Sequence, residues 1–411
     1  MAWLGVYVVT FNCARNIIQQ DLFASHLFDV LPKSGPQSTD LPEILVLSLQ
    51  EIAPIAYAFL GGSFLDPYFD AFCRSVNIAA GDQHYENIIT KNVGMTAVMV
   101  FVRGDVAENI SWIETAEVGV GVQEVGNKGA VGARFGYQIR EDTVDLTFVA
   151  AHLAAGEWAV ERRNEDWKNI AQKLVFSRVD NNGEKGAQAR EGGNEEDFPL
   201  LQAESSTGER DYGLYSPRSK FPRPTEDISS HRHYSHLLAK DQLTQELREQ
   251  RTLQDLSEAP ITFLPTYKFV FPRHQAIPER QLTTWTWAKK RWPSWCDRVL
   301  YRNFPSAALT GQGGIEVQGY DALQISPTSD HRAVALSASV PLKPVSAPTI
   351  FLPPFDIDLN WERKRLVARR KEIVVGVVAY LGLTWEGNGL LLGSSLILIG
   401  SYFALQSFRA A

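Results

Sequence analysis

The chain has 411 residues, of which 45% are apolar, 11% aromatic and 21% charged, and its formal net charge is −7. This composition is ample for a large buried core and excludes wholesale disorder. With 40 basic and 47 acidic residues there is no basic surplus, so the total charge does not indicate a nucleic-acid partner. The cysteines Cys13, Cys73 and Cys296 lie far apart, which argues against a disulfide framework and indicates a reducing compartment.

Short apolar runs rich in β-branched residues predict strands along most of the chain. The first, residues 3–10, has no basic flank or cleavage site and is predicted to be a buried strand, not a signal peptide. The other predicted strands are residues 44–49, 95–102, 130–135, 144–151, 261–264, 298–301 and 333–340. A helix is predicted over residues 157–179. Many strands separated by helices and long connections predict an α/β sandwich of packed sheets.

Residues 180–236 differ from the rest of the chain. They are rich in Gly, Glu, Ser, Arg and Pro and lack a convincing strand, which predicts a long and largely disordered insertion. His231, His233 and His236 form an HxHxxH pattern within it. No cysteine or carboxylate lies at a suitable spacing, so a solvated loop is favoured over a metal site.

The C-terminal part of the chain has the composition of a membrane anchor. Residues 373–405 are almost entirely apolar or glycine, with Glu386 the only formal charge. Residues 389–406 would form a helix of roughly 27 Å, close to the thickness of a hydrocarbon core. A buried helix of a soluble domain is the alternative, and a hairpin through residues 373–385 in place of a single crossing also stays open.

Basic residues lie directly before this apolar stretch and predict its orientation. They are Arg363, Lys364, Arg365, Arg369, Arg370 and Lys371, whereas only Arg409 follows. Because basic flanks stay cytosolic, the main domain is expected to face the cytosol. The five prolines of residues 341–354 are typical of a linker.

Polar residues follow the ends of several predicted strands, where an open α/β sheet usually binds its ligand. They are Asn12, Glu51, His152, Asp297 and the pair Asp330 and His331. One such residue would mean little, because solvent begins at strand ends, but their number predicts a convergent site. Glu51 and Asn12 offer hard oxygen ligands that suit a hydrated Mg²⁺. Zinc is disfavoured, and neither a serine nor a cysteine nucleophile is supported, because the corresponding motifs are absent from the sequence.

Three clusters of cations could bind a polyanion near these strand ends. They are the turn Val125-Gly126-Asn127-Lys128-Gly129, the stretch Pro265-Thr266-Tyr267-Lys268 and the run Lys289-Lys290-Arg291. Each alone is more readily explained as a solvated surface feature. Placed together around the same strand ends, they would form a pocket for several phosphates.

These residues together resemble the inositol polyphosphate 5-phosphatases of the endonuclease/exonuclease/phosphatase superfamily, in particular a tail-anchored, fungal-type member. Seven stretches occur in the family's order: Thr10-Phe11-Asn12, Leu49-Gln50-Glu51, Gly126-Asn127-Lys128-Gly129, His152-Leu153-Ala154-Ala155-Gly156, Pro265-Thr266-Tyr267-Lys268, Pro293-Ser294-Trp295-Cys296-Asp297-Arg298 and Ser329-Asp330-His331. The resemblance implies a DNase-I-like fold of two packed sheets flanked by helices, one Mg²⁺, and in-line attack of water on the 5-phosphate of an inositol ring.

The resemblance also implies a role for each matching position. Glu51 would ligate Mg²⁺ with Asn12 beside it, and His152 and His331 would contact the scissile phosphate, with Asp330 behind its partner histidine. Asp297 and Arg298 would organise the site. The implied substrate-binding residues are Asn127, Lys128, Tyr267, Lys268, Lys289, Arg291 and Arg298. Four of them (Tyr267, Lys268, Lys289 and Arg291) match positions that grip a 4-phosphate, so the implied head group is 4,5-bisphosphorylated.

One motif of the family is missing. The family carries a Gly-Asp-x-Asn-Tyr-Arg strand, in which the Asp orients the attacking water and the Asn stabilises the transition state. Residues 208–213 resemble this motif only superficially. Loss of the water-orienting base costs ~10²–10⁴ in rate, and loss of the donor roughly another 10²–10³. Either this chain lacks a segment that its native form has, which we favour because the rest of the site is complete, or it is an impaired relative. A lost central strand predicts a gap or a makeshift strand in one sheet near residues 180–236.

The sequence therefore predicts Mg²⁺-dependent hydrolysis of the 5-phosphate of phosphatidylinositol 4,5-bisphosphate at the cytosolic face of the endoplasmic reticulum membrane. The alternatives are a membrane-anchored, non-catalytic phosphoinositide-binding relative and, less favoured, a nuclease on the same scaffold. The expected organisation is a catalytic domain over residues 1–343 with its insertion at 180–236, a Pro-rich and then basic linker over 344–371, and an anchor over 373–406. No nucleic-acid partner and no obligate protein partner is expected.

Overall fold

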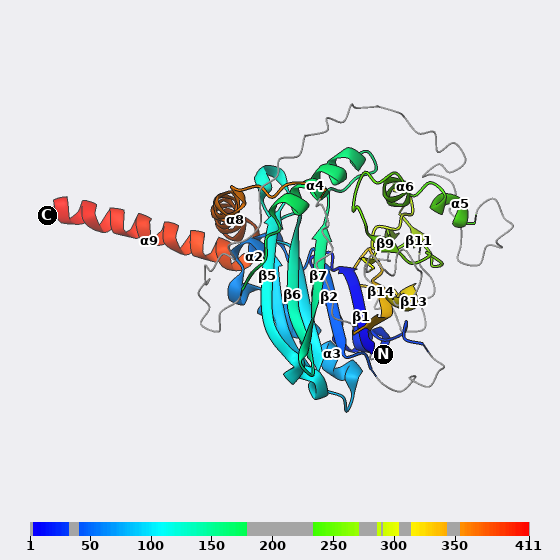
Figure 1. Ribbon diagram of the computed structural model, residues 1–411. Helices are drawn as coiled ribbons and strands as arrows, with labels where there is room; N and C mark the ends of the chain where they lie inside the picture. Colours follow the sequence, from blue (N-terminus) through cyan, green and yellow to red (C-terminus); the bar gives the residue numbers. More distant parts are fainter. Residues whose placement is uncertain are drawn as a thin grey trace.

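Two β-sheets packed face to face form the centre of the molecule, with helices on their outer sides (Figure 1). The computed structural model describes residues 3–32, 41–178, 233–270, 286–288, 291–303, 314–342 and 354–410. One sheet has six strands in the order β13 (Glu316–Ala322), β14 (Val334–Pro341), β1 (Trp3–Asn12), β2 (Ile44–Gln50), β4 (Thr96–Arg103) and β3 (Tyr85–Val93). The other has the order β7 (Asp142–His152), β6 (Gly129–Ile139), β5 (Ile110–Gly119) and β8 (Ser177–Arg178). The predicted α/β sandwich is thereby confirmed.

The middle strands of the larger sheet are apolar without interruption because both of their faces are covered. Leu45 and Leu47 of β2 pack into a core with Phe72 of helix α3 (Asp66–Ala80). The alternating residue Val46 points to the opposite side and packs with Phe135 of β6 in the layer between the two sheets. The period of two along a strand thus divides one apolar run between two cores.

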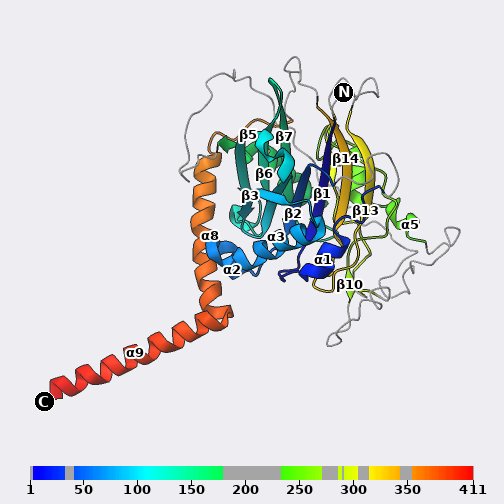
Figure 2. The ribbon, with the colours of Figure 1, turned by 90° about the horizontal axis from the view of Figure 1, so that it is seen from below.

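Helices cover both outer faces of the sandwich. Figure 2 shows α1 (Gln20–His26), α2 (Ile55–Leu60) and α3 beside the six-stranded sheet. On the other side, Ile170 of α4 (Val160–Lys173) packs with Ala130 of β6. The remaining short elements are η1 (Gly62–Phe64), η2 (Gly104–Asn109), η3 (Val122–Glu124), α5 (Ser235–Leu238), α6 (Gln242–Arg248) and the two-residue ladders of β9 (Ser257–Glu258) with β12 (Leu300–Tyr301) and of β10 (Phe269–Val270) with β11 (Thr286–Trp287).

Several predicted elements differ from the observed ones. The helix predicted over residues 157–179 ends at Lys173, because the chain then turns to pair β8 with β5 and places Phe176 beneath the guanidinium of Arg134, 4.1 Å from the ring centroid. The strand predicted over residues 261–264 is irregular, and the one over 298–301 is reduced to β12. Strands β3, β5 and β13 were not predicted, because polar residues interrupt their apolar pattern on a solvent-facing side.

Residues 180–232 of the predicted insertion lie outside the described part of the chain, and so does His231. The insertion was expected to extend to His236, but residues 233–236 are ordered and lead into α5. Leu237 of that helix is buried. Within the described ranges, no group of three or more His, Cys, Asp or Glu side chains could hold a metal ion.

The four-stranded sheet ends at β7 in the part of the chain that is described. Strand β7 pairs with β6 along its whole length, from Asp142 opposite Ile139 to His152 opposite Gly129. No other described strand pairs with β7. The gap or makeshift strand predicted from the missing motif concerns residues outside the described ranges and stays a prediction.

Two consecutive helices, α8 (Trp361–Leu383) and α9 (Trp385–Ala410), form the C-terminal part. The basic residues 363–371, predicted to belong to a linker, form the first half of α8, which lies along α2 (Figure 2). Gly376 permits this contact, since a Cβ at that position would lie 3.1 Å from the backbone nitrogen of Leu60. Helix α9 is long and apolar enough to span a membrane over residues 385–407, with a mean hydropathy of 1.6 and none of that window buried.

Candidate active site

Lys128 lies at the centre of a polar cluster between the ends of the two sheets. Its Nζ is 3.9 Å from Oε1 of Glu51, and its ammonium donates to the ring of His152, with 3.4 Å to Nδ1. Glu51 directly follows β2, Lys128 directly precedes β6, and His152 ends β7. Three strand ends that are far apart in sequence therefore meet at one edge of the sandwich, as the sequence predicts.

Burial shifts the protonation of this cluster. The pKa of His152 lies well below the ordinary histidine value, mainly because burial disfavours its charged form and also because Lys128 and His331 are positively charged neighbours. Burial also lowers the pKa of Lys128, whereas the nearby Glu51 carboxylate acts in the opposite direction. His152 is therefore a neutral imidazole at neutral pH, able to donate from one ring nitrogen and accept at the other.

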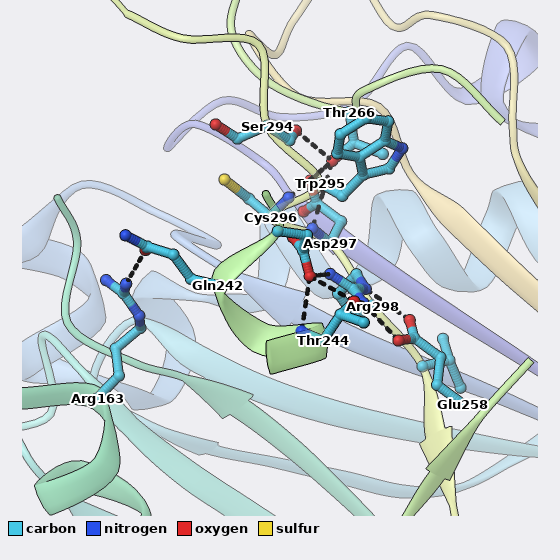
Figure 3. A network of polar contacts seen from close by, with 12 residues as sticks. Arg163, Gln242, Thr244, Glu258, Thr266, Ser294, Trp295, Cys296, Asp297 and Arg298 are labelled. Carbon is cyan, nitrogen blue, oxygen red and sulfur yellow. Dashed lines mark hydrogen bonds and ion pairs between the residues drawn. The ribbon is translucent and has the colours of Figure 1, made fainter. Parts of the chain in front are cut away.

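A second chain of hydrogen bonds leads to His331 (Figure 3 shows its Asp297 and Thr266 members). Nδ1 of His331 lies 2.9 Å from Oδ2 of Asp297, which also accepts a hydrogen bond of 2.7 Å from the hydroxyl of Thr266. Burial alone would lower the pKa of His331, but the charge of Asp297 and this hydrogen bond raise it above the ordinary value. Asp297 thus favours the protonated form of His331, whereas burial favours the neutral form of His152, which gives the two imidazoles different chemical roles.

Asp330 forms its described hydrogen bonds with Lys268 and Phe269 and none with a histidine. Its carboxylate accepts a hydrogen bond from the ammonium of Lys268, and its carbonyl accepts one of 2.9 Å from the N–H of Phe269. The role implied for Asp330 behind a histidine is therefore filled by Asp297. Asp330 instead holds Lys268, and it raises the pKa of that lysine against the opposing effect of burial.

Tyr267 and Lys268 border His331. Tyr267 forms an isolated β-bridge with His331, and the centroids of the two rings are 4.4 Å apart. The side chain of Lys268 is about one third exposed, at 35%. Arg291 is exposed, whereas Lys289 lies outside the described residues. Two of the four residues expected to grip a second phosphate are thus placed beside the histidine cluster.

Glu51 and Asn12 offer the oxygen atoms that could hold a metal ion. They end the parallel strands β1 and β2, where Asn12 is paired with Gln50, and the N–H of Arg15 donates to the carbonyl of Glu51. Glu51 has a φ of +47°, a strained conformation of the kind that collects at functional sites. One carboxylate and one amide suit a hard cation that keeps most of its waters, so the donor set fits Mg²⁺ and not zinc.

Arg15 is a candidate site residue that the sequence reasoning missed. Its Nε lies 2.9 Å from Oε2 of Glu51, and its own φ of +69° turns the chain back toward that carboxylate. The signal in the sequence was weak, since a single arginine three residues after a strand is more often a solvated side chain.

The turn that carries Lys128 has an unsatisfied acceptor. Oδ1 of Asn127 is buried and has no hydrogen-bond partner among the residues described. It lies so close to Gly121 that a Cβ on that glycine would be 1.7 Å away. A buried acceptor without a donor costs about 1–3 kcal/mol, which is a reason to expect a ligand there.

Helix α8 fastens the same turn from the other side. The N–H of Gly126 donates a hydrogen bond of 2.9 Å to Oε1 of Glu372, whose side chain is fully buried. Glu372 is also paired with Arg365 at 2.8 Å and with Arg369 at 3.3 Å. No sequence pattern predicts this role, because Glu372 is a single acidic residue next to a row of basic residues.

Arg298 does not enter the pocket, which corrects its assignment as a substrate-binding residue. Its side chain is only 3% exposed and pairs with Asp241 at 2.8 Å and with both oxygens of Glu258 (Figure 3 labels Arg298 and Glu258). These carboxylates raise its pKa despite burial. Arg298 therefore joins α6 to β9 and supports the segment that carries Asp297.

Comparisons with known proteins agree with this geometry. The model of a family described as "Endonuclease/Exonuclease/phosphatase family 2" matches residues 9–337. The chain is 33% identical over 263 residues to type II inositol polyphosphate 5-phosphatase 15 of Arabidopsis thaliana, covering 59% of this chain and 23% of that protein. It is 30% identical over 242 residues to phosphatidylinositol 3,4,5-trisphosphate 5-phosphatase 1 of Homo sapiens, covering 58% and 18%. The chain thus matches only about a fifth of the length of these curated relatives.

A solved structure has the same fold. The inositol polyphosphate 5-phosphatase domain of SPsynaptojanin, in complex with inositol (1,4)-bisphosphate and calcium ion, superimposes with a TM-score of 0.55 at 22% identity, covering 90% of each chain. At this level of identity the likeness concerns the fold, and it confirms the predicted two-sheet architecture of this family.

Proposed function

This chain belongs to the endonuclease/exonuclease/phosphatase family 2, and from that premise we propose that it is a phosphoinositide 5-phosphatase that acts on phosphatidylinositol 4,5-bisphosphate with Mg²⁺. The observation that carries the proposal is the convergence of Glu51, Lys128, His152 and His331 at one edge of the sandwich. The curated relatives are named as inositol polyphosphate or phosphatidylinositol 5-phosphatases, which supports the same substrate class.

Each residue of the cluster suits a step in phosphate hydrolysis. Glu51, with the amide of Asn12, would hold Mg²⁺, which when bound neutralises charge on the phosphoryl group. His331 is kept protonated by Asp297 and would donate from Nε2 to a phosphoryl oxygen. Neutral His152 would donate its remaining N–H to a second oxygen, and Lys128 would contribute a point charge.

A second phosphate on the same ring would bind to the cationic side chains beside His331. Lys268 stays charged and is partly exposed, next to the hydroxyl-bearing ring of Tyr267. We assign these two residues, with Arg291 and Lys289, to the 4-phosphate. We also assign Asn127, in the turn that carries Lys128, to substrate binding.

The proposed location is the cytosolic face of the endoplasmic reticulum membrane, with α9 as the span. The basic residues of α8 precede the span and favour a cytosolic domain. Attachment suits a lipid substrate, because it raises the local concentration of the enzyme at the surface where that lipid lies.

Phosphate release from dioctanoyl phosphatidylinositol 4,5-bisphosphate by the full chain, with and without Mg²⁺, tests the proposal. We expect Mg²⁺-dependent release with the 4-phosphate lipid as the product. The chain as it stands lacks the Asp-x-Asn strand, so the assay is repeated with that segment inserted within residues 180–232. Absence of turnover in both forms would refute the proposal.

A second candidate function is a non-catalytic, membrane-anchored reader of phosphoinositide head groups. The missing motif favours it, because its loss affects the water-activating part of the site and leaves the cations in place. It predicts binding to phosphoinositide liposomes without turnover, lost in a Lys268→Ala, Lys289→Ala double variant.

A further inference from the structure

Helix α8 has an apolar side that the domain leaves uncovered. Ala368, Glu372 and Gly376 form its buried stripe against the domain. The exposed apolar residues along the rest of the helix are Leu366 at 54%, Val367 at 42%, Ile373 at 43%, Val374 at 64%, Val375 at 42%, Val377 at 43%, Val378 at 66% and Leu383 at 76%. Helical spacing places Val374, Val377 and Val378 roughly opposite Glu372. A continuous apolar surface of this kind marks an interaction site.

Cations accompany this surface in the first half of the helix. Arg363 and Arg370 fall on the same outward side by helical spacing, and neither has an ion-pair partner within the described part of the chain. Arg363, Lys364 and Lys371 also line a cavity of about 300 Å³ between α8 and η3. The helix thus presents basic residues first and branched apolar residues after them. Arg370 and the branched apolar residues lie away from the domain, whereas Lys364 and Lys371 border the cavity next to η3.

The direction of α9 indicates what covers this side. Helix α9 begins two positions after α8 ends and leads away from the domain at a steep angle to α8 (Figure 2). In Figure 2, α8 lies along the side of the domain from which α9 leads away. With α9 across a membrane, α8 would run along the membrane surface and turn its uncovered side toward the lipid.

We propose that α8 is an interfacial helix that lies in the headgroup region of an anionic bilayer and holds the domain against it at a fixed orientation. Apolar residues on one side, flanked by arginines, are the composition of helices that bind at this depth. The proposal rests on the membrane span of α9 and does not depend on phosphatase activity.

A hairpin through the membrane is a poorer fit. Residues 373–383 would extend roughly 16 Å as a helix, about half of a hydrocarbon core. Insertion would also separate Gly376 from Leu60 and pull the ring of Tyr380 away from Phe64, whose centroid lies 5.5 Å from it. The buried Glu372 would lose its arginine partners or carry them into lipid.

Depth-dependent quenching in proteoliposomes tests the proposal on the full chain. Bimane is attached to Val374→Cys or Val378→Cys in a Cys73→Ala, Cys296→Ala background, since the remaining Cys13 is buried. The matched control is Ile78→Cys, a β-branched residue on α3 that is 53% exposed. Lipids brominated near the headgroup end or near the middle of the acyl chain serve as quenchers, in vesicles with or without phosphatidylserine.

We expect the labels at positions 374 and 378 to emit at shorter wavelength in vesicles and to be quenched about twofold more by shallow than by deep bromines, with the control unchanged. Quenching should be stronger with phosphatidylserine. Aqueous emission at both positions, stronger quenching by deep bromines, or equal quenching in neutral and anionic vesicles would each overturn the proposal. A wavelength shift without lipid quenching would also overturn it, because it would show that a second copy of the chain covers this side.

Discussion

The backbone N–H of Gly126 and the carboxylate of Glu372 are joined by a hydrogen bond of 2.9 Å, although 246 positions separate them in the chain. Gly126 precedes Asn127 and Lys128 of the candidate site, and Glu372 belongs to the helix that leads to the apolar span. The part of the chain that resembles a membrane anchor in composition therefore also supports the candidate site.

Replacing Glu372 by Ala should destabilise the domain. The substitution removes one of the two carboxylate partners of Arg365, which keeps Glu117, and leaves the N–H of Gly126 without its acceptor. A buried donor without an acceptor predicts a loss of about 1–3 kcal/mol in the free energy of unfolding. Urea unfolding in mild detergent, followed by tryptophan fluorescence, measures it. Glu362→Ala on the same helix is the control, since Glu362 is exposed and should change the value by less than about 0.5 kcal/mol. Equal effects of both variants would contradict the role given to Glu372.

Replacing Arg298 by Gln should impair stability and spare substrate affinity. Two buried carboxylates, Asp241 and Glu258, would lose their cation, at a cost of about 3–5 kcal/mol. The control, Arg74→Gln, removes an exposed pair with Asp70 worth roughly 0–1 kcal/mol. Unfolding measurements give the first effect, and the KM of the folded fraction the second. A large rise in KM at unchanged stability would return Arg298 to the substrate-binding set.

Asp297→Asn should move the alkaline limit of activity to lower pH. Asp297 raises the pKa of His331, so protonated His331 persists to higher pH than an ordinary histidine and activity falls as pH rises through that raised value. Without the carboxylate the fall begins earlier, and kcat drops ~10²-fold or more. A pH–rate profile of both proteins checks this, and an unshifted alkaline limb would argue against protonated His331 as the donor.

Asp297→Asn should also change how the free energy of unfolding depends on pH. The raised pKa of folded His331 contributes stability that is fully present below the ordinary histidine pKa and is lost as pH rises through the folded value. The difference in unfolding free energy between the native chain and Asp297→Asn should therefore shrink as pH is raised above neutrality. Denaturant titrations at a series of pH values measure it without any need for turnover.

Glu51→Gln should raise the Mg²⁺ requirement. The carboxylate is the one charged ligand that we propose, so its neutral amide analogue should shift the half-saturating Mg²⁺ concentration upward by roughly tenfold or more. Metal titrations of phosphate release measure the shift, with Glu114→Gln, a partly exposed residue on β5, as the control. An unchanged Mg²⁺ dependence would place the metal elsewhere.

The strand ends of the site could be predicted because an apolar run followed by one polar residue is a local pattern. Glu51 and His152 are of this kind, whereas Lys128 was found in a Gly-flanked turn that directly precedes β6. Strands β1, β2, β4, β6, β7 and β14 were found from their apolar runs. Edge strands such as β3 were missed, since one of their sides faces solvent and carries polar residues.

The errors in the predicted site arise because a sequence motif does not show in which direction each side chain points. Asp297 and Arg298 are adjacent in sequence, but side chains of an extended segment point to opposite sides. One therefore reaches His331 and the other the pair of Asp241 and Glu258. The partner of Glu372 depends on how α8 folds back onto the sandwich, which no local sequence pattern shows.

The packing of α8 on α2 decides where a soluble version of this protein should be cut. Truncation at the start of the basic stretch, before Trp361, would remove the hydrogen bonds from Arg369 to the carbonyls of Phe59 and Leu60. It would also expose the surface of α2 on which Gly376 packs. Truncation at Thr384 keeps these contacts and removes only α9. For expression and crystallisation, the useful boundary thus falls where the packing ends, some twenty residues beyond the point that hydrophilic composition alone suggests.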